Sequence, residues 1–503
     1  MNHEMRDRLR LDVDYLVEVN SKYWADSLNS KYDGGWIYVL HTIHHSFSTT
    51  VCEDVIAKGL QKREHLPIAS IISGRKGELM DLTSRVDASF GVEYRVQPSY
   101  YDYHNEDIEA LACRMAADTY GDPEGLIALT YRDIRFGDAL YDDLLRSGDH
   151  RKRGEAYSCF DISRERYQST VKKALATIDQ AYEIFEQRKP SYLITTEFLY
   201  IKALYAHVAS LLGAKILVAS TQYPDMIVQV SPEELPFSEL RVADITRMQM
   251  EKCVRGYQEI DNNTGDLFLA SSVKEDLPQF SEGQVGEKTV FILPHAMSDV
   301  PREACRNNIY FDYVQWFSDT IRIIKEIPGV NWVVKDHPWA DYYGQSDYVK
   351  RVFDENKTEN MYWIDKEYGG INIKYYADCV ITCAGDAGIE YWAYGIPTIS
   401  TAESHYSRLG ISYQMRSVAE YEHTLKNIKI LSKPSAESVK LAQKYLYAMK
   451  NWYKKDGSLS ELIYNTSRAE RNVWILTGDH FGAGNPEADN QQGEVILGFC
   501  KPI

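Results

Sequence analysis

The sequence predicts an α/β protein built from two doubly wound lobes. Short apolar runs alternate with segments of helical periodicity between residues 36 and 220, and a second alternating series occupies residues 289–400. A polar stretch with little periodicity, residues 260–288, separates the two series. The chain has 503 residues, which is more than one hydrophobic core usually holds. We therefore expect two parallel sheets, each covered by helices on both faces.

The first series begins after a helix or helical hairpin expected over residues 4–28. Its expected strands are 36–40, 67–72, 125–131, 191–197 and 214–220. Its expected helices are 51–59, 163–187 and 200–212. We assign residues 1–275 to this N-terminal lobe.

The second series forms the C-terminal lobe, residues 286–450. Its expected strands are 289–293, 331–335, 360–364, 379–382 and 397–400. Its expected helices are 312–326, 346–356, 387–394 and 419–453. Residues 451–503 read as a loose or partly extended C-terminal extension.

The composition excludes several functional classes. A formal charge of −17 argues against broad binding to nucleic acid or to an anionic lipid surface, because both need concentrated positive charge. The first thirty residues lack the apolar core of a signal peptide, and no apolar stretch is long enough to span a bilayer. The eight cysteines include no CxxC pair, which favours reduced thiols. We expect a cytoplasmic protein.

The most specific signal lies where two predicted strands of the second series end. Lys335 ends the strand 331–335, and Asp336, His337 and Pro338 follow it. Because ligands of open α/β sheets bind beyond the carboxyl ends of the strands, an imidazole or ammonium there is placed to meet a nucleotide phosphate.

A loop of small residues follows the strand 379–382. It consists of Cys383, Ala384, Gly385, Asp386, Ala387 and Gly388. Free backbone N–H groups at the start of a helix suit a phosphate or carboxylate. Glu390, one turn into that helix, is expected to accept hydrogen bonds from ribose hydroxyls. Alone, each of these segments is more often structural, but their order and spacing favour a nucleotide-sugar site.

These segments resemble a known family. The K-x-H-P strand end, the small loop, the stretch Glu390, Ala393, Gly395 and Pro397, and then HYSRLGIS are similar to bacterial capsule polysaccharide biosynthesis glycosyltransferases, relatives of the Kdo transferases. PHAMSDVPR at 294–302 and RFGDALYDDLLR at 135–146 are similar to the same group. The resemblance covers residues 290–450 well and the remainder in patches.

The resemblance implies a GT-B fold, with two Rossmann-like lobes facing a central cleft, and transfer of a sugar from a nucleotide donor. The donor would be a CMP-activated ulosonic acid, with His337 at its phosphate and His295 and the small loop beside the nucleotide. Thr382 stands where retaining relatives carry a glutamate, which favours an inverting reaction. The residues assigned to the donor site are His337, Lys335, Pro338, His295, Cys383, Ala384, Gly385, Asp386, Gly388 and Glu390.

The N-terminal lobe is expected to supply the acceptor site and the catalytic base. An inverting transfer needs a carboxylate or imidazole that takes the proton of the acceptor hydroxyl. Candidates at the strand ends are Glu197, Asp138 and His44. The loop after strand 36–40 also holds His41 and His45, and the pair His44-His45 is an alternative metal site, although the HTIHH run contains no carboxylate.

We expect neither a metal nor a cofactor, with the nucleotide sugar as substrate. Asp142 and Asp143 are expected on a solvated helix face. The expected partners are the nucleotide sugar and a glycan or glycolipid acceptor, with at most a peripheral membrane contact; a homodimer is left open. Three alternatives remain: a nucleotide-sugar 2-epimerase, a CDP-polyol phosphotransferase, and a non-catalytic glycan-binding protein.

Overall fold

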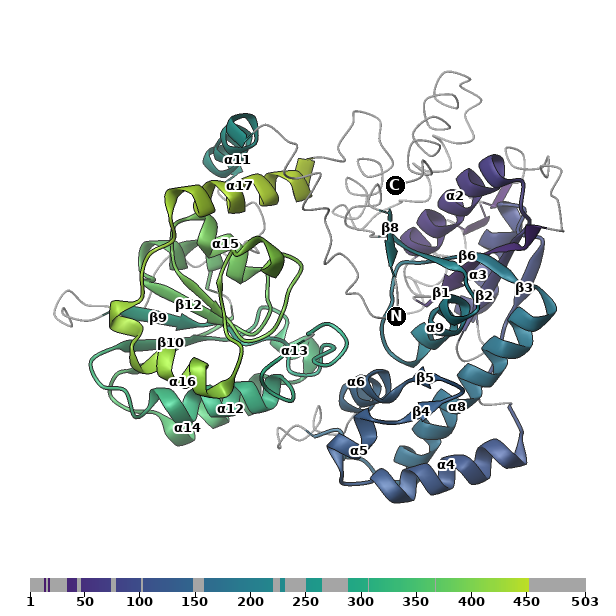
Figure 1. Ribbon diagram of the computed structural model, residues 1–503, viewed down its shortest axis with the longest axis horizontal. Helices are drawn as coiled ribbons and strands as arrows, with labels where there is room; N and C mark the ends of the chain where they lie inside the picture. The colour runs from purple at the N-terminus through teal and green to yellow at the C-terminus, as the bar shows by residue number, and fades with distance from the viewer. Residues whose placement is uncertain are drawn as a thin grey trace.

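The computed structural model contains two lobes, each built around a six-stranded sheet (Figure 1). The described residues are 13–14, 17–18, 34–42, 47–73, 78–100, 103–147, 158–219, 227–230, 250–264, 288–305, 307–366 and 368–451. The predicted helix at 4–28 is described at four residues only, all helical, and the extension after 451 lies outside the described residues.

The sheet of the N-terminal lobe has the order β3-β2-β1-β6-β7-β8. Its strands are β1 (Trp36–His41), β2 (Ile68–Ile72), β3 (Tyr94–Val96), β6 (Pro190–Thr195), β7 (Lys215–Ala219) and β8 (Ile227–Val230). All neighbours are parallel except β7 and β8. The continuous apolar runs of β1 and β2 are buried, as expected for strands with both faces covered.

Helices flank this sheet and fill the crossover between β3 and β6. They are α2 (Phe47–Glu64), α3 (Glu78–Ser89), α4 (Glu106–Thr119), α5 (Pro123–Ile127), α6 (Gly137–Ser147), α8 (Arg164–Gln187) and α9 (Leu204–Leu211), with a short 3-10 helix at Ile201–Ala203. The side chain of Ser163 caps α8 by accepting from the Arg166 N–H, which agrees with the predicted start of that helix.

One predicted strand of the N-terminal lobe is wrong. The apolar run 125–131 begins in helix α5, which has Pro123 in its first turn and ends at Ile127, and only Thr130–Tyr131 form a strand, β4. This strand pairs with β5 (Ile134–Arg135) as an antiparallel ribbon. Positive φ angles at Arg132 and Asp133 form its two-residue turn. A proline suits the first turn of a helix, and here this helix signal outweighs the apolar run that predicted a strand.

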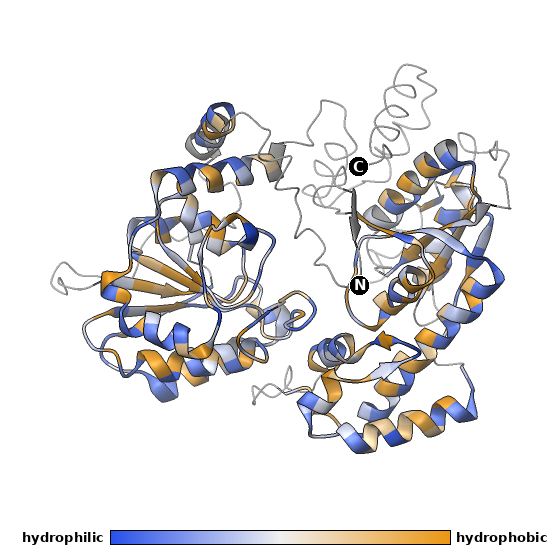
Figure 2. Cartoon of the chain, viewed as in Figure 1, coloured by the Kyte–Doolittle hydropathy of each residue, from blue (hydrophilic) through white to orange (hydrophobic). Residues whose placement is uncertain are grey.

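The sheet of the C-terminal lobe has the order β11-β10-β9-β12-β13-β14, entirely parallel. Its strands are β9 (Thr289–Ile292), β10 (Asn331–Lys335), β11 (Met361–Ile364), β12 (Cys379–Thr382), β13 (Thr398–Ser400) and β14 (Tyr413–Gln414). Its helices are α12 (Tyr313–Ile324), α13 (Ala340–Tyr343), α14 (Ser346–Asn356), α15 (Ala387–Ala393), α16 (Val418–Lys426) and α17 (Ala436–Asn451). Apolar strands lie at the centre of the lobe, and the helices turn polar residues outward (Figure 2).

The predicted helical segment 419–453 is divided. α16 ends at Lys426, and α17 begins at Ala436, after Lys433-Pro434, because a proline disfavours helical backbone in the residue before it. α17 packs against α11 (Met250–Thr264), and Tyr257 of α11 lies in one apolar cluster with residues of α15 and α17. Residues 250–264, which we assigned to the N-terminal lobe, therefore pack on the C-terminal one.

Both sheets share one strand order. Numbered along the chain, each reads third, second, first, fourth, fifth, sixth, which is the order of Rossmann-type nucleotide-binding folds. The chain reverses direction across each sheet between its first and fourth strands, β1 and β6 in one lobe and β9 and β12 in the other. The predicted pair of doubly wound, Rossmann-like lobes is thus confirmed, and the reversal points are where such folds bind ligands.

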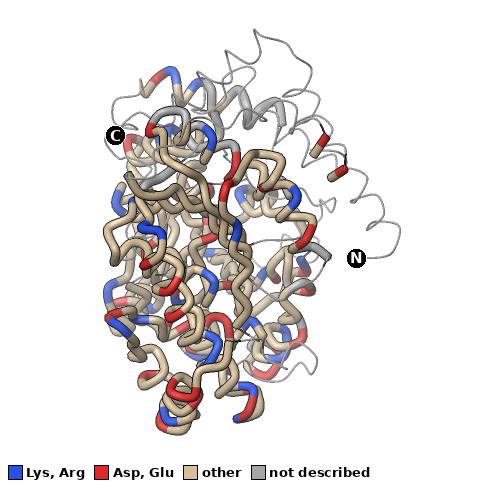
Figure 3. Tube along the Cα trace, turned by 90° about the vertical axis from the view of Figure 1, so that its right-hand side faces the viewer, with Lys and Arg blue, Asp and Glu red and all other residues tan. Residues whose placement is uncertain are grey.

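Acidic and basic residues are interspersed along the chain trace (Figure 3). Across the described residues, no helix is both long enough and apolar enough to cross a bilayer.

Candidate functional site

Three strand ends meet at the reversal point of the C-terminal lobe. β9 lies between β10 and β12 in the sheet, so the segments that follow these strands emerge side by side. They carry His295 after β9, His337 after β10, and the loop 383–386 after β12. Parallel strands end at the same edge of a sheet, and three sequence segments far apart in the chain therefore form one site.

His295 joins the ends of β9 and β12. Its Nε2 accepts a hydrogen bond from the Ala384 N–H at 3.0 Å, and its ring stacks on Tyr313 with 4.3 Å between ring centroids. Burial, together with the nearby His337, lowers the pKa of His295 to about 3. The ring is therefore neutral at pH 7 and carries its proton on Nδ1.

His337 is held by its own loop. Its backbone N–H donates to Asp336 Oδ1 at 2.8 Å, and its Nδ1 accepts from the Trp339 N–H at 3.1 Å. Burial and the charge of Lys335 lower the pKa of His337 to about 4. With Nδ1 accepting, the neutral ring carries its proton on Nε2, which is a hydrogen-bond donor.

The residues beside His337 differ in accessibility. Lys335 is 5% exposed and donates from Nζ to the Asp336 carbonyl at 3.2 Å. Pro338 is exposed, and Trp339 has an exposed fraction of 65%, which is large for a tryptophan. The buried ammonium acts on the site through its charge, whereas Trp339 offers a free aromatic face beside His337.

The small-residue loop contributes mainly backbone. The Cys383 side chain is fully buried and accepts from the Thr401 hydroxyl at 3.3 Å, so it points into the core. A Cβ on Gly385 would lie 3.3 Å from His295 Nε2, and one on Gly388 would lie 1.9 Å from the Tyr406 hydroxyl oxygen. The two glycines thus let the loop approach His295 and let α15 pack on Tyr406.

Of the two acidic residues of this segment, Asp386 already has a partner and Glu390 is buried. Asp386 accepts from His405 Nε2 at 2.7 Å, and His405 Nδ1 lies 2.7 Å from the Tyr445 hydroxyl. Burial opposes ionisation, but His405 outweighs it and holds the pKa of Asp386 below its usual range. Glu390 is 7% exposed. This burial gives Glu390 little surface for the ribose contact that the sequence predicted, and that role stays a prediction.

Glu197 lies at the reversal point of the N-terminal lobe, just after β6. Burial raises the pKa of Glu197, while Lys202 and a hydrogen bond from Thr42 lower it in part. Lys202 also donates from Nζ to the Thr42 carbonyl at 2.6 Å, which connects the segments after β1 and β6. A carboxyl group with a raised pKa at a strand end is suited to proton transfer.

Asp138 belongs to a contact between the lobes. Its carboxylate pairs with Arg302 of the C-terminal lobe at 3.0 Å and with Arg135 at 3.1 Å. From the same helix, α6, the Tyr141 hydroxyl donates to Asp312 Oδ2 at 2.5 Å. Asp138 is thus held by two guanidinium groups, an arrangement that suits a structural role.

The expectation that Asp142 lies on a solvated helix face is wrong. Asp142 is fully buried and accepts from the backbone N–H groups of Arg302 at 3.1 Å and Glu303 at 2.9 Å. Asp143 is partly exposed and pairs with Lys173 at 3.1 Å. Helical periodicity predicts which residues share a face, but it does not reveal that a second lobe covers that face. His44 and His45 lie outside the described residues.

No family model matches this sequence, and no curated protein matches it. Among solved structures, the KpsC β-Kdo 2,7 transferase of Thermosulfurimonas dismutans is similar at 13% identity and a TM-score of 0.34, covering 58% of this chain and 90% of that one.

Two further structures cover 86% of this chain. They are Anabaena HepE in complex with UDP-glucose (10% identity, 100% of that chain, TM-score 0.28) and a putative UDP-N-acetylglucosamine 2-epimerase from Listeria monocytogenes (9% identity, 96% of that chain, TM-score 0.26). These similarities are too distant to assign a family, and the fold rests on the strand order of the two sheets.

Proposed function

We propose that the C-terminal lobe binds the phosphate of an activated nucleotide, which would make this protein a nucleotide-sugar enzyme. The supporting observation is the convergence of His295, His337 and the loop 383–386 at the reversal point of a Rossmann-ordered sheet. Within that class we propose an inverting glycosyltransferase, which transfers a sugar, a CMP-activated ulosonic acid in our proposal, to a growing surface polysaccharide in the cytoplasm.

In this proposal His337 stabilises the leaving group. Its Nε2–H would donate to a phosphate oxygen, where negative charge grows as the bond from the anomeric carbon to oxygen breaks. The charge would be met by the imidazole and by backbone N–H groups, so the proposed step invokes no metal at the phosphate.

Glu197 is our proposed base, because Asp138 is paired with two arginines. The Glu197 carboxylate would take the proton of the acceptor hydroxyl as that oxygen attacks the anomeric carbon, and the nucleotide phosphate would depart from the opposite face. The raised pKa of Glu197 brings its basicity closer to neutral pH, where proton transfer is most effective. His44 remains a predicted alternative.

The test is nucleotide binding followed by turnover. Thermal unfolding of the full chain is measured with CMP, CDP, UDP and GDP, and a ligand at a hundred times its dissociation constant adds about 2.7 kcal/mol to the free energy of unfolding. We expect CMP to give the largest shift and His337→Ala to abolish it. If none of the four nucleotides shifts the transition, the donor site is refuted.

Turnover separates the alternatives. The protein is incubated with nucleotide sugars, with and without a glycan acceptor. Nucleotide release that depends on the acceptor supports a transferase. Interconversion of a UDP-sugar without any acceptor would instead establish a 2-epimerase, and a product that carries phosphate would establish the phosphotransferase. Binding without turnover of any donor would leave a non-catalytic protein and overturn the proposed reaction.

A further inference from the structure

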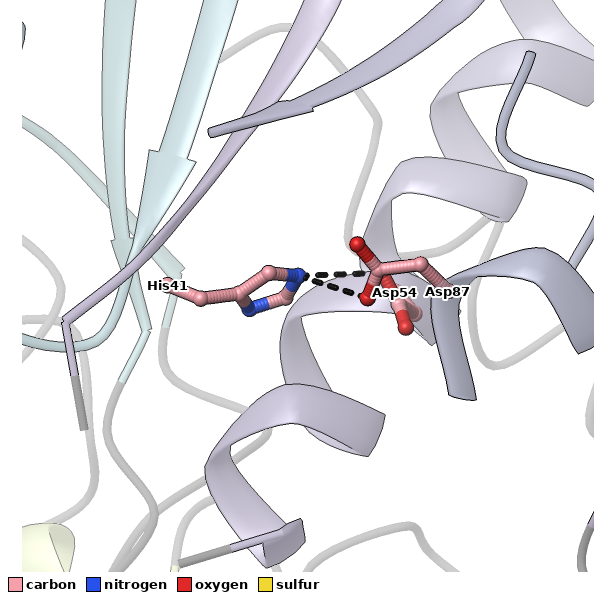
Figure 4. Close-up of side chains that lie close together, drawn as sticks. All are labelled: His41, Asp54 and Asp87. Atoms are coloured by element: carbon pink, nitrogen blue, oxygen red, sulfur yellow. Dashed lines mark ion pairs between the residues drawn. The ribbon is translucent and has the colours of Figure 1, made fainter. Parts of the chain in front are cut away.

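Three ionisable side chains are buried together in the N-terminal lobe. They are His41 at the end of β1, Asp54 on α2 and Asp87 on α3, with exposed fractions of 1%, 1% and 0% (Figure 4). Burying three such groups is costly unless their charges and hydrogen-bonding atoms find partners. Neither the donor site nor the proposed base uses this cluster.

Among the described residues, the facing atoms of the cluster have no hydrogen-bond partner. His41 Nε2 lies 2.9 Å from Asp87 Oδ1 and 3.7 Å from Asp54 Oδ1, in neither case with hydrogen-bond geometry. Both oxygens of Asp54 are buried and unsatisfied. One atom from each residue lies within 4.8 Å of the other two. Ligand atoms held at about 2.1 Å from a metal are themselves about 3.0–3.4 Å apart. The separations of 2.9 and 3.7 Å lie just below and just above that range, so small shifts of the side chains would bring the three atoms to one ion.

Outer contacts orient two of the three residues. Nδ1 of His41 lies 2.6 Å from Glu53 Oε2, and Glu53 Oε1 accepts from the backbone N–H of Thr196 at 2.7 Å. The Ser70 hydroxyl donates to Asp87 Oδ2 at 2.5 Å, which leaves Oδ1 directed at the cluster. A carboxylate behind the far nitrogen of a ligating imidazole is the usual support of a metal-bound histidine.

We propose that His41, Asp54 and Asp87 bind one divalent transition-metal ion. One imidazole nitrogen with two carboxylate oxygens suits Zn²⁺ or Mn²⁺, whereas Mg²⁺ prefers oxygen ligands and retains several waters. The three ligands come from β1, α2 and α3, so the ion links the strand to two helices that come after it in the chain. Because the ligands are almost fully buried, the ion stabilises the lobe and does not contact the sugar.

The direct test is the metal content of the wild-type chain. The full-length protein is purified without chelators, and its metals are measured by mass spectrometry. We expect about one zinc or manganese ion per chain. After chelation, adding Zn²⁺ or Mn²⁺ should raise the Tm by about 5 °C, and Mg²⁺ should not. A chain that purifies without metal and shows no shift with Zn²⁺ or Mn²⁺ overturns the proposal, and so does a shift with Mg²⁺ alone.

Substitutions of the proposed ligands test where the ion binds. Asp54→Asn keeps the shape of the side chain but removes a charged ligand, and His41→Gln removes the nitrogen. Each should weaken metal binding by about 10- to 100-fold or more, while Asp118→Asn on the exposed face of α4 should bind as the wild type does.

The metal-free variants provide the control for folding. Metal-free Asp54→Asn should unfold close to metal-free wild type, because a neutral amide replaces a buried carboxyl group of equal size. Metal binding that persists in both variants would indicate sites elsewhere on the chain and would refute the assignment. Loss of metal binding in these variants would leave the proposed donor site unchanged. The metal test is therefore independent of the proposed transferase activity.

Discussion

The two lobes place a histidine at the same topological position and give it opposite chemistry. His41 ends the first strand of one sheet, and His295 follows the first strand of the other. Burial would lower the pKa of His41, but Asp87 and Glu53 outweigh it and raise the pKa well above its usual range. Burial and His337 lower the pKa of His295 to about 3. Neighbouring charges, and not the fold, thus decide whether this position is surrounded by carboxylates that attract a cation, such as the proposed metal ion, or holds a neutral hydrogen-bonding ring.

In the proposed reaction, proton transfer at the N-terminal reversal point belongs to Glu197 and not to His41, which is almost fully buried. We expect Glu197→Gln to reduce turnover by about 10²–10⁴-fold, because the amide cannot accept the proton. Glu186→Gln, an exposed position on α8, is the matched control and should be neutral. The kcat/KM is measured against pH, and the variant should lose the limb that reports the base. An unchanged pH profile would remove Glu197 from that role.

On the C-terminal side, His337→Ala should reduce turnover by about 10- to 1,000-fold, the range expected for one contact to a developing charge. The fold should survive, because among the described residues the imidazole is hydrogen-bonded only to the Trp339 N–H of its own loop. The exposed His423→Ala on α16 serves as the control. Wild-type kinetics in the His337 variant would show that His337 does not contact the developing charge, and the proposed difference in role between the two lobes would fail.

A substitution in the closely packed residues behind the loop 383–388 should change stability, and its effect should be smaller than the two losses of turnover above. Gly388→Ala places a methyl group on the Tyr406 hydroxyl, which also donates to the Gly385 carbonyl at 2.7 Å. We expect a loss of about 1–3 kcal/mol in the free energy of unfolding, as for overpacked cores. Adding Tyr406→Phe should recover part of this loss by removing the oxygen. The pair is measured by denaturant titration, and additive effects would contradict the proposed clash.

The pH dependence of stability tests the protonation state of His295 directly. Its folded pKa of about 3 lies below the ordinary 6.5, so between these values the unfolded chain binds a proton that the folded chain does not. Stability should therefore fall as the pH falls from 6.5 towards 3. His295→Gln should flatten this dependence by at most about 1.4 kcal/mol per pH unit, the value for one proton. A variant with the wild-type slope would show that His295 titrates normally.

Sequence patterns were reliable where an element depends on its own residues. The predicted strands at 331–335 and 379–382 and the helix at 346–356 agree with β10, β12 and α14 in their bounds. Buried parallel strands are continuous apolar runs, and such runs are visible without knowledge of the tertiary structure. The convergence of His295, His337 and the loop 383–386 was also predictable, because parallel strands end at one edge of a sheet.

Sequence patterns failed where one segment covers another. The burial and pairing of Asp138 and Asp142 depend on Arg302 and Glu303, which lie in the opposite lobe. The metal cluster was missed because His41, Asp54 and Asp87 occupy three elements without any local spacing motif. The available signal was His41 at the end of the otherwise apolar strand β1, because α2 and α3 contain many other polar residues.

By itself, the sequence determined the α/β class, the two lobes and the strand ends at which we propose the donor site, because these follow from hydrophobic periodicity and chain direction. Tertiary structure alone decided which carboxylates meet arginines, which meet a histidine in the core, and which histidine stays neutral. Those outcomes depend on burial and on charges a few ångströms away, and residues distant in the chain supply both.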